Sequence, residues 1–500
     1  MNLYELGACF FFGFMLWLCV ILKVIIMPKN SQKLNIDIET ISAIFIIIFV
    51  SAFILANFFV GFILPLYILA MGISLALTLF FPRSGLFALT FLTIIFERFF
   101  TLSTIIMGKV EYKIYPLDII LLAIFISVLI QLIFKIIKSV HMQKSDYLLG
   151  AFIFLNIFYF FFSTHIIKAD SILAFSTLKN YAFYPLIYFT TFILIRNADD
   201  LKRFFQFFLT GAIFIISFII YGALNGEGLW TQFTPLSTEG VRILAFTHGL
   251  YLSLAFISAL VYLIFQKGKK NLFYWLLAIW GIGIVGTMMR HLWISLISTM
   301  FLIYILLSKE NRKKMREISY RYIFLFLCLG IFVFYVMSMN PSSKIYTGFQ
   351  NTTKAVFQRG ASIGKAKTDE SFAWRKLVWN ASYKEFQKNP ILGIGTGKKV
   401  YAETESYRDY IEVRNIHNSY LSIFIQLGIL GIGIFLLFLY SNIKELIQSI
   451  TIRENIFYKF SVLGALSIFV IALCFQPYLE TNLLSIFFWI ALGISRKITV

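Results

Sequence analysis

Three arginines and one histidine stand beside apolar runs of this chain, where charged or titratable side chains are costly. Arg242, Arg290 and Arg375 carry guanidinium groups, whose planar donors bind phosphate oxygens in pairs. His417 carries an imidazole that titrates near neutrality, so it can take a proton from a hydroxyl group. If the arginines converge on a diphosphate beside the histidine, the four residues form a site that transfers a group away from that diphosphate.

Arg290 is the most informative of these residues. It lies in Gly286-Thr-Met-Met-Arg290-His291-Leu-Trp between two apolar runs, which predicts a tight helical hairpin with the arginine in its turn. A charge at that depth favours a functional role, and the alternative is an arginine that anchors a helix end at the membrane surface. The alternatives for Arg375 and Arg242 are a solvated charge and a membrane-flanking charge. His291 is a weaker, supporting candidate.

His417 closes the longest polar interval of the chain, and Asn418 after it can orient the imidazole or cap the next helix. The alternative for His417 is an interfacial ring at a helix start. Within the interval, residues 370–388 carry apolar side chains at helical spacing and predict a helix that Asn389-Pro390 ends. Residues 342–368 lack clear periodicity and predict an irregular, mobile segment.

Other motifs do not predict a site. The segment Gly393-Ile-Gly395-Thr-Gly397-Lys398-Lys399 resembles a phosphate-binding loop, but position 392 is not glycine and position 399 is neither Ser nor Thr. A turn is expected there instead. The cysteines lie in apolar runs without paired spacing, and the acidic pairs are expected to be solvated or at a helix start. We therefore expect no metal site and no cofactor.

The composition decides the class of protein. Of the 500 residues, 59% are hydrophobic and only 14% are charged, which excludes a soluble globular protein. The net charge of +20 gathers in short segments such as 266–270 and 309–316, as in the cytoplasmic loops of membrane proteins. No basic stripe with base-stacking aromatics is present, so nucleic acid is not an expected partner. The expected surroundings are a lipid bilayer.

Apolar runs predict an all-α polytopic integral membrane protein with about fourteen transmembrane helices. The expected spans fall near 7–27, 41–59, 62–81, 84–104, 116–137, 147–163, 173–195, 204–222, 247–265, 272–289, 291–308, 322–339, 418–440, 459–477 and 482–495. The Lys- and Arg-rich connections are expected in the cytoplasm, namely 28–40, 138–146, 196–203, 266–271, 309–321 and 441–458. Residues 223–246 and 340–417 then face outward, away from ATP and nucleotide sugars.

Four regions follow from this topology. Residues 1–222 are N-terminal transmembrane helices, and residues 223–339 are transmembrane helices with the external loop 223–246 and the arginine hairpin near 290. Residues 340–417 form one large, partly helical periplasmic or extracellular loop, and residues 418–500 are C-terminal transmembrane helices. The first apolar run has lysines after it rather than before it, which predicts a permanent helix rather than a cleaved signal.

Three motifs, taken in order, resemble the O-antigen ligase/polymerase superfamily over roughly residues 270–440. They are the hairpin Gly286-Thr-Met-Met-Arg290, the block Arg375-Lys-Leu-Val-Trp379 with Asn389-Pro390-Ile-Leu-Gly393-Ile-Gly395, and His417-Asn418-Ser-Tyr-Leu421. Met289 and His291 beside the arginine depart from the serine and small residue that are more usual in the family. The resemblance implies a GT-C-like, metal-independent, inverting glycosyltransferase in the bacterial inner membrane. Such an enzyme moves a glycan from undecaprenyl diphosphate to an acceptor hydroxyl on the external face.

The resemblance also implies roles for single residues. Arg290 and Arg375 would bind the donor diphosphate, and His417 would take the proton of the acceptor hydroxyl. Arg242 has a loose counterpart in an external loop that polymerases often need, while Asn418 and His291 would support the site. The implied partners are the lipid-linked glycan donor and the glycan acceptor, with a chain-length regulator and a flippase as candidates.

The exact reaction stays open at this point. A polymerase of O-antigen or capsular repeat units is favoured over an O-antigen ligase acting on lipid A–core, because the expected spans exceed those of ligases and the loop is basic enough to hold an acidic glycan. A protein-glycosylating relative is a third possibility. A flippase or other transporter of lipid-linked glycans is an alternative from another class, which paired repeats with charges at mid-membrane would indicate.

Overall fold

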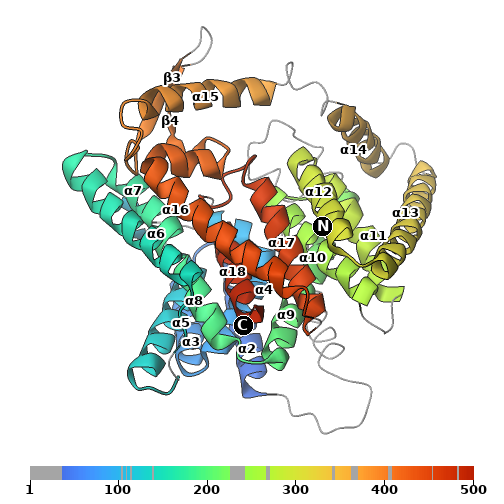
Figure 1. The fold of residues 1–500 in the computed structure, drawn as a ribbon. Coiled ribbons are helices and arrows are strands. Elements are labelled where there is room, and N and C mark those ends of the chain that lie inside the picture. Colours follow the sequence, from blue (N-terminus) through green and yellow to red (C-terminus); the bar gives the residue numbers. More distant parts are fainter. Residues whose placement is uncertain are drawn as a thin grey trace. The chain divides into compact units, whose positions relative to one another are not determined.

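The computed structural model describes the chain apart from residues 1–36, 103–104, 108–109, 113–114, 138–139, 226–242, 266–270, 340–343, 362–369, 404–407, 453, 481–482 and 500. The expected first span and Arg242 therefore lie outside the described residues. The described chain is mostly helical (Figure 1). It divides into two compact units, one made of Met1–His141 and Thr190–Ala212 and the other of Met142–Phe189 and Ile213–Val500.

The first unit is a group of apolar helices held by ion pairs. Its elements are α2 (Ile38–Phe59), α3 (Leu64–Phe80), α4 (Pro82–Leu102), β1 (Ile105–Met107), β2 (Val110–Tyr112), α5 (Pro116–Ile133) and the start of α9 (Ala198–Asn225). The guanidinium of Arg83 in α4 lies 3.0 Å from a carboxylate oxygen of Asp200 and 3.3 Å from one of Glu39. Asp200 stands in the first turn of α9, as the sequence predicted for this acidic pair.

The second unit contains the site residues that the structure describes. Its elements are α6 (Lys144–Phe161), η1 (Phe162–Ile166), α7 (Ser171–Leu178), η2 (Lys179–Phe183), α8 (Leu186–Leu194), α10 (Phe246–Phe265), α11 (Asn271–Gly286), α12 (Arg290–Leu306), α13 (Lys309–Ser338), α14 (Lys344–Ala361), α15 (Glu370–Phe386), β3 (Lys399–Glu403), β4 (Arg408–Glu412), η5 (Val413–Asn415), α16 (Ser419–Ser449), α17 (Ile456–Ala472) and α18 (Leu484–Ile498). α8 and α9 each continue into the other unit.

α10 is the centre of this unit. It is buried along nearly its whole length and packs against α11, α12, α13 and α17. Glycines permit the closest of these contacts, because a Cβ on Gly464 of α17 would lie 2.2 Å from the side chain of Ile257. On the other side of the unit, α16 pairs with α6.

A buried charge pair also holds this unit. The guanidinium of Arg496 in α18 donates to both carboxylate oxygens of Asp146 in α6, at 3.2 to 3.3 Å. The hydroxyl of Tyr188 donates to the same carboxylate at 2.7 Å. Asp146 is 0% exposed and Arg496 is 4% exposed, so each charge is compensated inside the fold.

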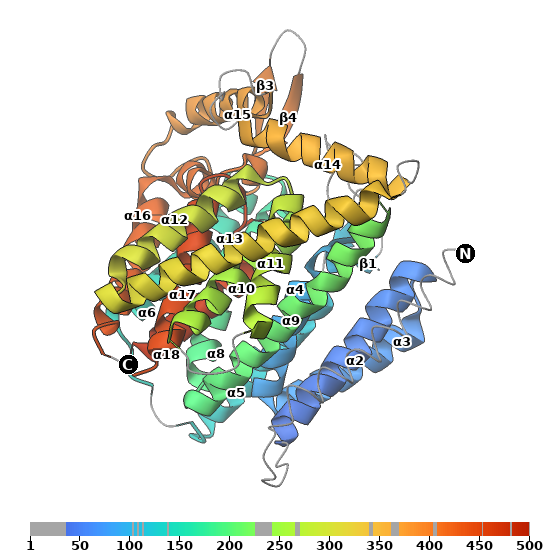
Figure 2. The ribbon, with the colours of Figure 1, turned by 90° about the vertical axis from the view of Figure 1, so that its right-hand side faces the viewer.

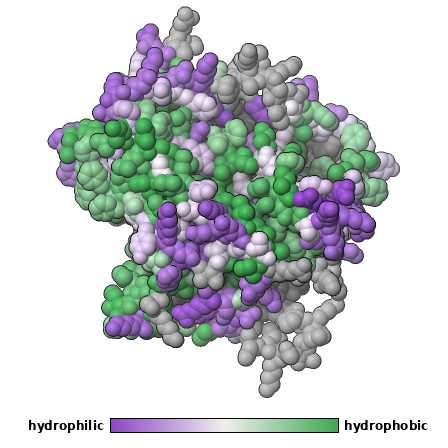
Figure 3. All heavy atoms as spheres, in the orientation of Figure 1, coloured by the Kyte–Doolittle hydropathy of each residue, from purple (hydrophilic) through white to green (hydrophobic). Residues whose placement is uncertain are grey.

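Seven of the described helices are long and apolar enough to cross a membrane, namely Ile38–Asn57, Pro116–Ile133, Lys144–Ile166, Ala198–Ile220, Phe246–Phe265, Lys309–Val336 and Ser419–Ser449. Five further apolar helices are shorter, namely Leu64–Phe80, Pro82–Phe96, Asn271–Gly286, Arg290–Leu306 and Ile456–Ala472. Figure 3 shows apolar side chains over α6 and α16 and polar ones over α15 and β3–β4. Exposed side chains such as Phe154, Phe158 and Leu437 suit contact with lipid. The protein is therefore a multi-pass membrane protein.

The structure corrects one expectation and adds detail to two others. Residues 342–368 were expected to be irregular, but α14 occupies most of this segment, because its Gln, Lys and Ala residues favour a helix. The basic connection 309–321 is the first part of α13, where Lys314 and Glu310 form an ion pair at 2.6 Å one turn apart. The expected all-α fold also contains two antiparallel strand pairs, β1–β2 and β3–β4.

Candidate functional site

The arginine hairpin has the form that the sequence predicted. α11 ends at Gly286 and α12 begins at Arg290, so the turn is short. The hydroxyl of Thr287 donates to the carbonyl of Ile284 at 2.7 Å, and Met288 adopts a left-handed conformation with φ of 58°. A bulky residue rarely takes that conformation, and such strain is concentrated at functional sites. Arg290 stands half-buried at the first position of α12.

A small apolar core joins α15, the β3–β4 hairpin and the start of α16. Its buried members are Val378, Phe386, Ile394, Val400, Ala402, Ile411, Val413, Ile416 and Ile425. β3 contributes alternate residues to this core, since Val400 and Ala402 are buried while their neighbours are exposed. Figures 1 and 2 both show α15 and the hairpin at one end of the helices of this unit. The core therefore fixes α15 relative to the beginning of α16.

The glycine-rich segment after α15 is a turn, as expected, and it pairs with a break in α16. Gly428 interrupts the helix with φ of 70°. Backbone amides of Ile394 and Gly395 donate to the carbonyls of Ile425 and Gln426 at 2.9 and 3.0 Å. These bonds satisfy carbonyl groups near the kink, which a membrane helix cannot leave unpaired. The turn thus packs into α16.

The same turn is also bound to the helices η1 and α6. The hydroxyl of Tyr159 donates to the carbonyl of Leu392 at 2.5 Å. The amide of Thr396 donates to the hydroxyl oxygen of Ser163 at 2.8 Å. The turn that follows α15 is therefore hydrogen-bonded to α16 on one side and to α6 and η1 on the other. These bonds limit how far α15 and its side chains can move.

His417 is held on several sides by this framework. The indole nitrogen of Trp379 donates to the carbonyl of the preceding residue, Ile416, at 2.7 Å. The ring of Trp374 meets the imidazole edge-on, with the ring centres 5.4 Å apart. The Nδ1 atom of His417 lies 2.9 Å from the Oε1 atom of Gln476 in the connection between α17 and α18. His417 itself has φ of 57°, a left-handed conformation that its neighbours must enforce.

Asn418 has the helix-capping role that was one of its two expected roles. Its side-chain oxygen accepts a hydrogen bond from the amide of Leu421 at 3.0 Å at the start of α16. Replacing such a cap with alanine costs about 1 kcal/mol. The ring of His417 is oriented by Gln476, which the sequence did not indicate.

The surroundings of His417 favour its neutral form. Burial lowers the pKa of the imidazole below its ordinary value of 6.5, and the positive charge of Arg375 lowers the pKa further. The hydrogen bond to Gln476 acts in the opposite direction. Arg375 follows Trp374 in α15, the residue whose ring packs against the imidazole. A neutral imidazole near neutral pH can accept a proton.

The described part of the connection between α17 and α18, residues 473–480, contacts both the arginine hairpin and His417. Its Tyr478 places the hydroxyl 2.6 Å from Nε2 of His291, the residue after Arg290. Its Gln476 binds His417. Arg290 and His417 are thus linked through one short connection, which carries three residues that the sequence analysis missed: Gln476, Tyr478 and Glu480. The sequence feature that could have pointed to them is that Gln476 and Glu480 are polar residues between two apolar runs.

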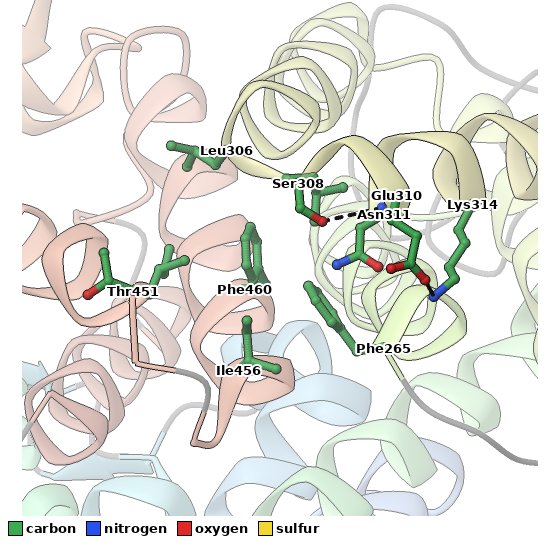
Figure 4. Close-up of a pocket in the computed structure, with 11 residues that line it drawn as sticks. Phe265, Leu306, Ser308, Glu310, Asn311, Lys314, Thr451, Ile456 and Phe460 are labelled. Atoms are coloured by element: carbon green, nitrogen blue, oxygen red, sulfur yellow. Dashed lines mark hydrogen bonds and ion pairs between the residues drawn. The ribbon is translucent and has the colours of Figure 1, made fainter.

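A separate hollow of about 510 Å³ lies at the opposite end of α10, α12 and α17. Figure 4 shows Lys314 paired with Glu310 beside Phe265 and Phe460 at this place. None of the candidate site residues lines it. Among the described residues, no group of three His, Cys, Asp or Glu side chains is arranged to hold a metal ion.

Comparison with known proteins gives one family. Residues 275–436 match the family model described as O-antigen ligase. No curated protein matches the chain. The match runs from α11 into α16, so it includes Arg290, Arg375 and His417 and ends before Gln476. The match confirms the resemblance of this multi-pass membrane protein to the O-antigen ligase/polymerase superfamily over residues 275–436.

Proposed function

We propose that the protein is a glycosyltransferase that moves a glycan from undecaprenyl diphosphate to a sugar hydroxyl of an acceptor. The reaction takes place on the external face of the bacterial inner membrane and polymerises O-antigen or capsular repeat units. The observation that carries this proposal is the packing of His417 against Trp374, the residue before Arg375, within the part of the chain that matches the O-antigen ligase family.

The proposed chemistry follows from the residues present. His417 takes the proton of the acceptor hydroxyl, and the oxygen attacks the anomeric carbon of the donor from the side opposite to the diphosphate. The bond between that carbon and the diphosphate oxygen breaks, so the configuration inverts. Undecaprenyl diphosphate leaves with the bonding electrons, and Arg290 and Arg375 stabilise its negative charge. In this scheme cationic side chains bind the leaving group.

The positions of the arginines suit a lipid-linked donor. Arg290 lies at the end of α12, and both α11 and α12 are apolar helices of a membrane protein. A diphosphate attached to a polyprenyl chain has its charge at the membrane surface, where a helix end can meet it. Arg242 is proposed as a further contact on the grounds of the resemblance alone, since it lies outside the described residues.

The test is complementation of a strain that lacks the gene. Wild type, His417→Ala, Arg290→Ala and Arg375→Ala are expressed, their presence in the membrane is measured, and surface polysaccharide is read on a gel. Arg408→Ala is the matched control, because Arg408 is an exposed arginine of the same loop that pairs with Glu403. We expect the control to restore the wild-type pattern and the three site variants to reach the membrane without restoring it.

The lipid-linked intermediates separate the alternatives. A strain without the gene should accumulate single repeat units on the lipid if the protein is a polymerase. Accumulation of complete lipid-linked polymer would instead identify a ligase. If all three site variants restore the wild-type pattern, the assignment of the site is wrong and a flippase becomes the better explanation.

A further inference from the structure

We propose that residues 473–480, which follow α17, position the base of the transfer reaction. Gln476 holds His417 as the tautomer that carries its proton on Nδ1 and leaves Nε2 free to accept one. The inference deepens the proposed function and rests on it for the role of His417. It lies outside the region that the family model matches.

The tautomer follows from the contact between the two side chains. The Oε1 atom of Gln476 lies 2.9 Å from Nδ1 of His417. With the amide assigned in this orientation, its oxygen can only accept a hydrogen bond, so we infer that the ring nitrogen opposite it donates. A neutral imidazole carries one proton, and with that proton on Nδ1 the lone pair is on Nε2.

The imidazole has little freedom to leave this arrangement. Trp374 packs edge-on against the ring, and Trp379 holds the carbonyl of Ile416 just before it. Asn418 caps α16 directly after it. These contacts fix the backbone around His417, so its imidazole can only rotate about its own side-chain bonds. The contact with Gln476 then selects one orientation of the ring.

Gln476 is itself fixed through Ser419, the first residue of α16. The amide of Ser419 donates to the carbonyl of Leu473 at 2.9 Å. The hydroxyl of Ser419 lies 3.3 Å from the carbonyl oxygen of Gln476 and 2.5 Å from the carboxyl group of Glu480. Leu473, Gln476 and Glu480 are therefore all tied to the first residue of the helix that begins two residues after His417.

Glu480 extends the same framework to η2. Its carboxyl group is hydrogen-bonded to the hydroxyl of Tyr181, and its backbone carbonyl accepts from the side chain of Asn180 at 2.8 Å. Glu480 is only 5% exposed. A buried carboxyl group with these partners serves to hold the connection in place.

The first measurement reads the tautomer without any need for activity. The full-length protein contains only five histidines, so ¹⁵N-histidine labelling in nanodiscs gives a simple NMR spectrum. The signal of His417 is assigned as the one missing from His417→Ala. We expect a protonated Nδ1 and an unprotonated Nε2 in wild type, and a mixture of the two tautomers in Gln476→Leu. A proton on Nε2 in wild type would overturn the inference.

The second measurement is transfer by the purified full-length protein, using an undecaprenyl diphosphate-linked oligosaccharide extracted from the strain without the gene. We expect Gln476→Leu to lower kcat about 100-fold, within the range that general-base catalysis contributes. Gln476→Glu keeps an acceptor at Nδ1 and should restore most of kcat. Its negative charge should raise the pKa of His417, so the rise of activity with pH should move to higher pH.

Cys474→Ala is the matched control, because Cys474 lies exposed in the same connection and its thiol contacts the carbonyl of Val470. If Gln476→Leu keeps the kcat and pH profile of this control while His417→Ala is inactive, the positioning role is wrong and the proposed function stands. If His417→Ala retains transfer, the proposed site itself is wrong, and the NMR result still decides the tautomer.

Discussion

The Nε2 atom of His291 and the hydroxyl oxygen of Tyr478 lie 2.6 Å apart, which joins the arginine hairpin to the connection between α17 and α18. Both side chains are buried. The rings of Phe246 and Tyr478 are stacked with their centres 6.3 Å apart, so the tyrosine also contacts the start of α10. The arginine hairpin, which is proposed to bind the donor, and the proposed base are thereby supported by neighbouring residues of one connection.

Tyr478→Phe tests this support. The change removes one hydroxyl group from a buried hydrogen bond, which costs about 1 to 3 kcal/mol. We expect the KM for the lipid-linked donor to rise several-fold, because a shift of the hairpin would also displace Arg290. The pH dependence of kcat should stay as in wild type, since Gln476 still holds His417. Tyr401→Phe is the control, because its ring is 46% exposed, and an equal change in KM for both variants would contradict the prediction.

Gly428→Ala tests the break in α16. Gly428 has φ of 70°, and a Cβ there would lie 2.0 Å from the carbonyl oxygen of Ile391. The left-handed conformation alone costs about 1 to 2 kcal/mol with a side chain present. We expect a lower thermal denaturation midpoint in detergent and weaker transfer, because the turn after α15 would be displaced.

Gly433→Ala provides the comparison for Gly428→Ala on the same helix. A Cβ on Gly433 meets no atom within 4 Å, and alanine favours a helix. Its denaturation midpoint should equal or exceed that of wild type. Equal midpoints for the two variants would show that the break is not needed for the fold.

The hydrophobic periodicity was sufficient to predict the helical membrane fold, the hairpin at Arg290 and the helix before Pro390. These features depend on neighbouring residues, so a local pattern reveals them. The β3–β4 hairpin was missed because its strands are short and lie among polar residues. α14 was missed because polar residues outnumber apolar ones in it, which hid the helical spacing of its apolar side chains.

The candidate site was predicted in part. Asn418 caps α16, as one of its two expected roles required, while the roles of Arg375 and His417 stay predictions. Gln476 could not be assigned from the sequence, because its partner lies 59 residues earlier and no local spacing relates the two. Such a contact depends on how α16 and α17 pack, which a single sequence does not specify.

Asp146→Asn tests the buried pair that holds α6 to α18. The change leaves the guanidinium of Arg496 in the interior without its counter-charge, which costs about 3 to 5 kcal/mol. We expect a large fall in the denaturation midpoint or loss of the protein from the membrane. Glu385→Gln breaks the exposed pair with Lys388 and should shift stability by less than about 1 kcal/mol. Similar stabilities for the two variants would mean that the buried pair contributes little.

Arg375→Gln tests the electrostatic contact with His417. The positive charge of Arg375 opposes protonation of the imidazole, so its removal should raise the pKa of His417 toward the ordinary value of 6.5. NMR titration of ¹⁵N-labelled His417 measures this directly, even if the variant no longer transfers glycan. Arg375→Lys keeps the charge and should leave the pKa near that of wild type, while the lysine loses the paired donors that hold a diphosphate.

Lys376→Gln is the control for Arg375→Gln, because it removes a charge from the next position of α15, where the side chain is exposed. It should leave the titration of His417 unchanged. The lowered pKa of His417 also affects the stability of the fold. Because the pKa is lower in the folded protein, the unfolded chain binds the proton more readily. The free energy of unfolding therefore falls as the pH drops below 6.5. Arg375→Gln should weaken that fall, and an unchanged fall would mean that Arg375 does not act on the imidazole.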